Sequence, residues 1–210
     1  MRIRVERFLL SLLVSALISG CSGYRANYDI GLVKADRPVG AVESYGKHDI
    51  LKVEEDGPDL SYFEDGLVKI IWTPTAEEVA FEITNKTTNP ITIVWEQAKF
   101  IDDAGAAHRT VHSGVSYTAV SDPQEPSIIK ANETHRDLIF SADNIFYSDA
   151  RWQRKPMFQT FAMSRNAENF DADIQANVGK SFSVVLPLAV NGTVHEYSFA
   201  FEVTGVQVGQ

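Results

Sequence analysis

Two histidines with nearby aspartates have types and spacing that could bind a metal ion. His108 and His112 lie four positions apart, and Asp102 and Asp103 come shortly before them. Imidazole nitrogens and carboxylate oxygens both bind zinc, which needs three or four ligands at about 2 Å. On a strand, residues four apart share a face but lie about 13 Å from each other. The β-branched residues between the histidines disfavour a helix that would bring them together. We therefore expect no metal site. If one formed, its candidate ligands would be His108, His112, Asp102 and Asp103.

A basic and aromatic segment, residues 151–155, stands out in a chain with a net charge of −9. Arginine and tryptophan are common where proteins bind partners, and lysine adds charge for a phosphate-rich or acidic partner. The candidate partner-binding residues are Arg151, Trp152, Arg154 and Lys155. The alternative is a surface loop in which Trp152 closes the end of the fold.

The chain has a single cysteine, Cys21, directly behind an apolar segment. Three arginines lie within residues 2–7, and residues 8–18 contain no charge. This length fits the apolar part of a secretion signal, about 7–15 residues, and is shorter than the roughly 20 residues of a spanning helix. The four residues Ile-Ser-Gly-Cys at 18–21 resemble the lipobox of bacterial lipoproteins.

The resemblance to the lipobox implies a lipidated protein. The thiol of Cys21 would receive a diacylglyceryl group, the signal peptide would be cut before Cys21, and the new amino terminus would be acylated, for instance with palmitate. Ser22 resembles the residue found there in outer-membrane lipoproteins. We therefore expect the cell envelope, at the outer membrane facing the periplasm, and no cofactor beyond this covalent lipid. The alternatives are an ordinary signal peptide that contains a cysteine, or a buried free thiol.

Sequence motifs of catalysis are absent. The sequence has no P-loop, no G-x-S-x-G, no H-E-x-x-H and no dinucleotide-binding glycine motif. The negative net charge disfavours nucleic acid as a partner, since phosphates attract basic proteins. We therefore expect a protein that is not an enzyme and that binds no nucleic acid.

The elements that would position these residues are mostly strands. Alternating apolar and polar residues over 79–84 and 91–96, with a turn cluster at 85–90, predict a hairpin with Trp95 facing inward. Alternation on both sides of Asn191-Gly192 predicts a second hairpin. Further strands are predicted over 67–72, 110–117, 127–130 and 137–140, and short helices from near 171 to 177 and within 141–152, where Ser141 would be the N-cap.

Residues 62–208 resemble uncharacterised bacterial envelope lipoproteins with an immunoglobulin-like domain. The strings that carry the resemblance are FEITNKTTNPITIVWEQAKFID and the closing pair VVLPLAVNG and YSFAFEV. Trp95 resembles the core tryptophan of that fold. The expected organisation is a signal peptide over 1–20, a lipidated extended tether over 21–61 and an all-β, immunoglobulin-like antiparallel β-sandwich over 62–208. Acidic residues near the start of the domain, Asp65 among them, are expected on a solvated surface.

These features predict a lipid-anchored cell-envelope protein with a non-enzymatic binding or assembly role. Its partners would be the membrane, through the lipid anchor, and another envelope protein. An alternative is a small-ligand or metal-binding lipoprotein that faces the periplasm. A third, an envelope hydrolase, lacks a recognisable pair of nucleophile and base.

Overall fold

The computed structural model describes residues 23–53, 60–163 and 167–209, and every strand pairing in it is antiparallel. The all-β prediction is confirmed. The signal peptide and Cys21 lie outside the described residues.

The strands are β1 (Tyr24–Asp36), β2 (Asp49–Val53), β3 (Leu60–Glu64), β4 (Val68–Pro74), β5 (Val79–Asn85), β6 (Ile91–Ile93), β7 (Lys99–Ile101), β8 (Ala107–His112), β9 (Ser127–Ile129), β10 (Thr134–Ser141), β11 (Ile145–Ser148), β12 (Arg151–Arg154), β13 (Phe161–Ala162), β14 (Ser181–Val190) and β15 (Thr193–Gly209). The helices are α1 (Ala41–Tyr45) and α2 (Ala167–Gln175), with 3₁₀ turns η1 (Trp95–Gln97), η2 (Tyr117–Ala119) and η3 (Ala142–Asn144).

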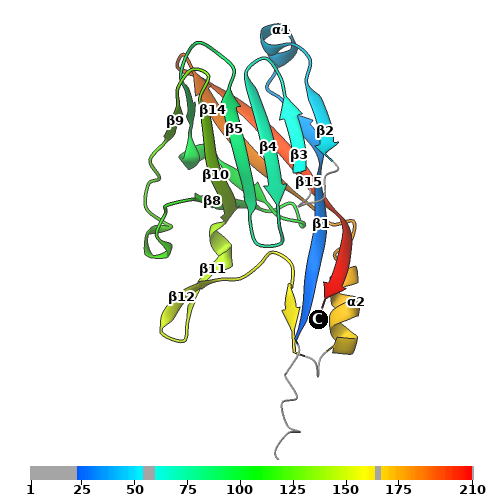
Figure 1. Ribbon diagram of the computed structural model, residues 1–210. Coiled ribbons are helices and arrows are strands. Elements are labelled where there is room, and N and C mark those ends of the chain that lie inside the picture. The colour runs from blue at the N-terminus through cyan, green and yellow to red at the C-terminus, as the bar shows by residue number, and fades with distance from the viewer. Residues whose placement is uncertain (1–22, 54–59, 164–166, 210) are drawn as a thin grey trace, which may run out of the picture.

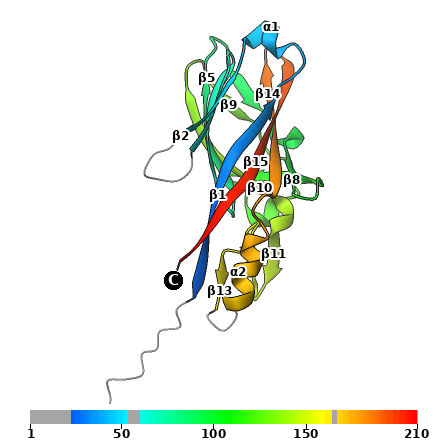
Figure 2. The ribbon, with the colours of Figure 1, turned by 90° about the vertical axis from the view of Figure 1, so that its right-hand side faces the viewer.

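One long sheet folds over to make two layers. Its strand order is β13-β1-β15-β14-β7-β8-β10-β5-β4-β3-β2, with β6 and β9 attached to β14. Figure 2 shows the layer of β1, β14 and β15 facing the layer of β2 and β5. The sheet passes from one layer to the other through β7 and β8, which pair with each other. The immunoglobulin-like arrangement stays a prediction.

Aromatic side chains fill the space between the two layers. Trp72 of β4 and Phe63 of β3 meet Phe199 of β15, with ring centroids 4.8 and 5.1 Å apart. All three side chains are fully buried. Burying an aromatic side chain removes a large apolar area from water, so this cluster stabilises the contact between the two layers.

Of the two predicted hairpins, the C-terminal one is confirmed. Strands β14 and β15 pair from Val190↔Thr193 outward, across a turn in which Asn191 and Gly192 have φ of 49° and 80°. The predicted hairpin of residues 79–84 and 91–96 is wrong. Strand β5 pairs with β4 and β10, while β6 pairs with β14 and β9, so residues 85–90 cross between layers.

The tether predicted over residues 21–61 is wrong for the described part of that range. Strand β1 pairs with β15 through eleven residue pairs, and Ile30 and Leu32 are buried in the main core. Strand β3 spans the predicted domain boundary between residues 61 and 62. The folded domain therefore includes residues from Tyr24 onward.

Two smaller predictions also need correction. Trp95 is buried as expected, but it lies in the 3₁₀ turn η1, where its indole N–H donates to Ser127 Oγ over 2.9 Å. The helix predicted within 141–152 is only the 3₁₀ turn η3, although Ser141 does cap it by accepting from the N–H of Asp143. The helix predicted over 171–177 is α2, which begins and ends earlier.

Asp65 is buried and does not lie on a solvated surface. Its carboxylate accepts hydrogen bonds from the backbone N–H groups of Leu67 and Val68 and from the hydroxyl of Tyr197. The guanidinium of Arg37, itself almost completely buried, lies 3.4 Å away. Burial and the Asp65 charge raise the pKa of Tyr197 far above its ordinary range. This buried ion pair holds the segment that leads to α1 against the sheet.

Candidate functional site

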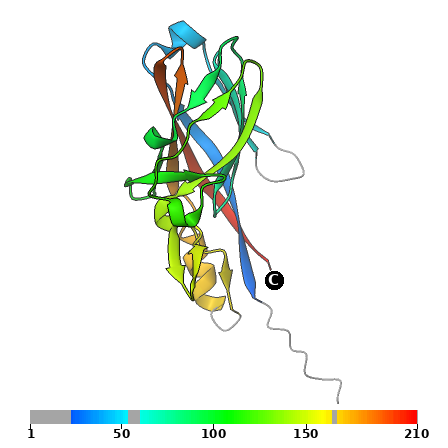
Figure 3. The ribbon, with the colours of Figure 1, turned by 90° about the vertical axis from the view of Figure 1, so that its left-hand side faces the viewer.

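The hairpin of β11 and β12 forms a small sheet separate from the long one. Its turn residues Asp149 and Ala150 have φ of 52° and 59°, the left-handed geometry of a two-residue hairpin turn. Tyr147 and Trp152 pair across the strands, with their rings 5.4 Å apart and nearly edge to face. Figures 1 and 3 show this hairpin at the same end of the molecule as α2.

The aromatic side chains of the hairpin are exposed. Tyr147 is 61% exposed, Trp152 43% and Phe146 40%. Large apolar side chains gathered on a monomer surface commonly mark an interaction site. The sequence analysis found Trp152 but missed Tyr147, which becomes its cross-strand neighbour only when the turn at 149–150 forms, and Phe146, which pairs with Gln153 on the other face of the hairpin.

The three basic residues predicted with Trp152 have different surroundings. Arg154 is mostly buried, pairs with Glu78 over 2.8 Å and lies over the ring of Phe140, so it fastens the hairpin to the long sheet. Arg151 is exposed and has no ion pair within the described residues. Lys155 is also exposed and lines a cavity at the base of the hairpin.

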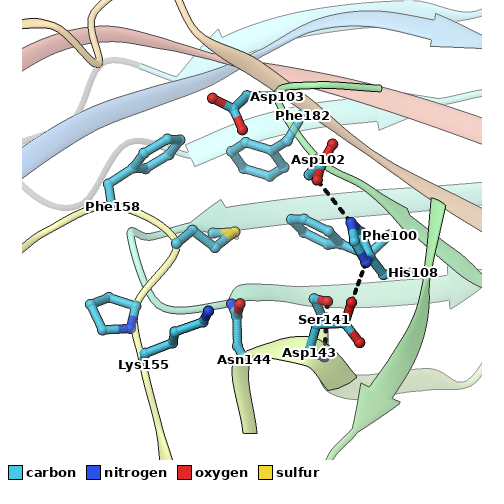
Figure 4. A pocket seen from close by; sticks show the side chains of 12 residues that line it. Phe100, Asp102, Asp103, His108, Ser141, Asp143, Asn144, Lys155, Phe158 and Phe182 are labelled. Carbon is cyan, nitrogen blue, oxygen red and sulfur yellow. Dashed lines mark hydrogen bonds and ion pairs between the residues drawn. The ribbon is translucent and has the colours of Figure 1, made fainter. Parts of the chain in front are cut away.

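That cavity has a volume of about 460 Å³ and lies between the base of the hairpin and the ends of β7, β8 and β14. Figure 4 shows His108 of β8 between the carboxylates of Asp102 and Asp143, with apolar walls from Phe158 and Phe182. The imidazole Nε2 lies 2.8 Å from Asp102 Oδ2, and Nδ1 lies 2.6 Å from Asp143 Oδ2.

The two carboxylates favour the charged form of His108. The hydrogen bond to Asp102 is the largest effect and raises the pKa of His108; burial opposes it, and the hydrogen bond and charge of Asp143 raise the pKa further. The same hydrogen bond from His108, with that of the Ala106 backbone N–H, lowers the pKa of Asp102. A doubly protonated imidazole has no free lone pair, so in this state it cannot act as a base or a metal ligand.

The four candidate metal ligands are not brought together. His112 stacks on Trp95, with ring centroids 4.2 Å apart, and its Nδ1 lies 3.2 Å from the carboxylate of Asp137. Asp103 forms an ion pair with Lys180. Of these four residues, only His108 and Asp102 contact each other, through the hydrogen bond between their side chains. Across the described ranges, no group of three or more histidine, cysteine, aspartate or glutamate side chains could hold a metal ion.

The cavity also contains a polar group that lacks a partner. The side-chain Nδ2 of Asn144 is buried and makes no hydrogen bond to any described residue. Leaving a buried amide unpaired costs free energy, so a turn of the Asn144 side chain that lets this group donate to a ligand atom in the cavity would be favoured. No spacing pattern in the sequence points to Asn144 or Asp143, because the cavity forms only when η3 packs beside β8.

Comparisons with models of protein families, with characterised proteins and with solved structures found no match to this chain. In the part of the chain that the structure describes, no helix has the length and apolar character needed to cross a membrane.

Proposed function

We propose that this chain is a lipid-anchored cell-envelope protein whose β11–β12 hairpin binds another component of the envelope, without catalysis. The observation that carries the proposal is the exposed pair of Tyr147 and Trp152 beside Arg151, which is exposed and has no ion pair among the described residues. Tyrosine, tryptophan and arginine are the residues that most often dominate binding energy at interfaces. Their cross-strand pairing orders the two rings before binding, which lowers the entropic cost of association.

The anchor in this proposal is Cys21, on the strength of the lipobox at residues 18–21. A single acyl chain holds a protein only marginally at a membrane, whereas two or more hold it stably. The Cys21→Ser protein is therefore expected to leave the membrane fraction, and Ser22 favours the outer membrane as the place of the wild-type protein. A Cys21→Ser protein that stays membrane-bound after a salt wash would contradict the anchor.

The binding role is tested by photo-crosslinking in living cells. A photoreactive amino acid at Tyr147 should give a reproducible adduct with one envelope component, identified by mass spectrometry. The same amino acid at Ile128, which is 67% exposed on β9, is the matched control. We expect the adduct at position 147 only, and its loss in the Cys21→Ser protein. The same adducts at both positions would refute a specific role for the hairpin.

A second candidate function is binding of a small ligand in the cavity beside His108. The observation that favours it is the buried and unpartnered Nδ2 of Asn144. A ligand with an acceptor for this group should change the imidazole NMR signals of His108, and Asn144→Ala should abolish the change. Equilibrium dialysis with Zn²⁺, Cu²⁺ and Ca²⁺ separately tests metal uptake, and no uptake at micromolar metal would remove the metal-binding version.

A further inference from the structure

The exposed aromatic side chains of the described residues gather at one end of the molecule. Phe146, Tyr147 and Trp152 belong to the β11–β12 hairpin, and Phe161, which is 47% exposed, belongs to β13. Figure 1 shows the hairpin and β13 at the lower end, while α1 lies at the opposite end. The exposed large apolar residues near α1, such as Val42, are aliphatic. We call the lower end, formed by β11, β12, β13 and α2, the aromatic end.

The proposed anchor is attached at this same end. Strand β1 begins at Tyr24, which pairs with Ala162 of β13, and Arg25 pairs with Phe161. Cys21 precedes Tyr24 by three residues. A fully extended chain spans at most about 3.6 Å per residue, so about 11 Å is the longest reach between the lipidated residue and the start of β1.

We propose that the aromatic end rests on the surface of the lipid bilayer, which is the envelope component that the β11–β12 hairpin binds. This inference rests on the proposed lipid anchor at Cys21. Tryptophan and tyrosine favour the boundary between headgroups and acyl chains, because the ring is apolar and its polar atom stays hydrated. An anchor within about 11 Å of the aromatic end keeps these rings at a high local concentration beside the bilayer.

Charge at the aromatic end is mixed, so the aromatic rings carry the contact. Arg25, Arg151 and Lys155 are exposed basic residues, and Asp171 and Asp173 are exposed acidic residues on α2. Basic side chains near an anionic lipid surface attract it and acidic ones oppose this. Contact is therefore expected with zwitterionic and anionic bilayers alike, and it should change little with salt.

Tryptophan fluorescence offers a direct test, because the chain has three tryptophans and Trp152 is the exposed one. Trp72 and Trp95 are buried in the core. The lipidated mature protein, which begins at Cys21, would be placed in vesicles of phosphatidylethanolamine and phosphatidylglycerol, with and without brominated acyl chains, which quench tryptophan on contact. We expect a loss of the Trp152 signal in the brominated vesicles, and no such loss in the Trp152→Phe protein.

A matched control moves the fluorophore to the other end of the molecule. Val42 of α1 is 58% exposed, and Val42→Trp in the Trp152→Phe background should show no quenching by brominated lipid.

Flotation of the same vesicles tests separately whether the protein is anchored to the membrane. Protein that floats with the vesicles but shows no quenching of Trp152 would overturn the bilayer contact and leave the anchor intact. Protein that does not float would refute the anchor itself. A protein adduct at Tyr147 in cells, together with no quenching, would assign the hairpin to a protein partner instead.

Discussion

His108 donates from both ring nitrogens, to Asp102 and to Asp143, and so its protonation is linked to folding. Its folded pKa lies above the ordinary value of 6.5. The stability that it contributes is therefore fully present below pH 6.5 and is lost as the pH rises through the folded pKa. We expect NMR titration of the imidazole to give a midpoint above 6.5, and Asp143→Asn to lower it. An unchanged midpoint in Asp143→Asn would show that the hydrogen bond does not form in solution.

Outside the aromatic core, loss of the buried carboxylate of Asp65 should strongly destabilise the fold. Asp65→Ala would leave the N–H groups of Leu67 and Val68 without their acceptor and the Arg37 charge buried without a partner. Removing one partner of a buried ion pair costs about 3–5 kcal/mol. Urea unfolding should show a loss of this size. Tyr197→Phe, which removes one hydrogen bond to the same carboxylate, should cost about 1 kcal/mol. Equal, small losses in both variants would contradict the central role of the carboxylate.

At the scale of elements, the turn of the β11–β12 hairpin contains a strained alanine. Ala150 has a φ of 59°, a left-handed conformation that costs a residue with a β-carbon about 1–2 kcal/mol. Ala150→Gly removes this cost but adds some entropy to the unfolded chain. We expect a hairpin that is more stable by about 1 kcal/mol and slower amide exchange in β11 and β12. Ala150→Val should accelerate the exchange, and no difference between the two variants would place the turn in another conformation.

Strand β1 gives a second prediction for an element. Because β1 pairs with β15 along most of its length, its amides should exchange slowly with deuterium, at rates similar to those of β15. A mobile tether would exchange within seconds. Hydrogen exchange with mass spectrometry on peptides that cover residues 24–36 distinguishes these outcomes.

The elements that the sequence predicted well are those with an unbroken pattern. Strands β14 and β15 alternate regularly and meet at Asn191-Gly192, a turn that fixes their register locally. Strand β1 was missed because its pairing with β15 shifts register after Asp29 and after Leu32, and such bulges interrupt the alternation. The crossing at residues 85–90 has the composition of a hairpin turn. Its distinguishing contacts, from the Asn85 side chain to the carbonyls of Ile129 and Lys130, join distant parts of the chain.

The candidate site was also predictable only in part, because some of its contacts join segments that are distant in the sequence. Trp152 and Arg151 stand out by composition, and both are exposed. The surroundings of His108 depend on Asp143, which is far along the chain and reaches it only through the packing of η3 beside β8. Spacing within one segment cannot reveal a contact between two segments that fold together.

At the scale of the whole molecule, the proposed anchor and bilayer contact define which end faces outward. Val42 on α1 should then be accessible, and Trp152 should be shielded by lipid. Cys21 is the only cysteine of the sequence, so if it carries lipid, Val42→Cys or Trp152→Cys would supply the sole free thiol. We expect a polar maleimide to label Val42→Cys readily in vesicles and Trp152→Cys only after detergent is added. Equal labelling of both before detergent would contradict this orientation.

The long pairing of β1 with β15 also has a mechanical consequence. If the anchor holds the start of β1 while a load acts on the β14–β15 turn at the opposite end, the two pulls act on neighbouring paired strands in opposite directions. The hydrogen bonds of an antiparallel pair lie perpendicular to the strands, so such a pull shears all eleven residue pairs at once. Bonds loaded together in shear resist far more force than bonds that are peeled apart one after another. The first strand of the domain would thus serve as a strong mechanical link between the bilayer and whatever the far end holds.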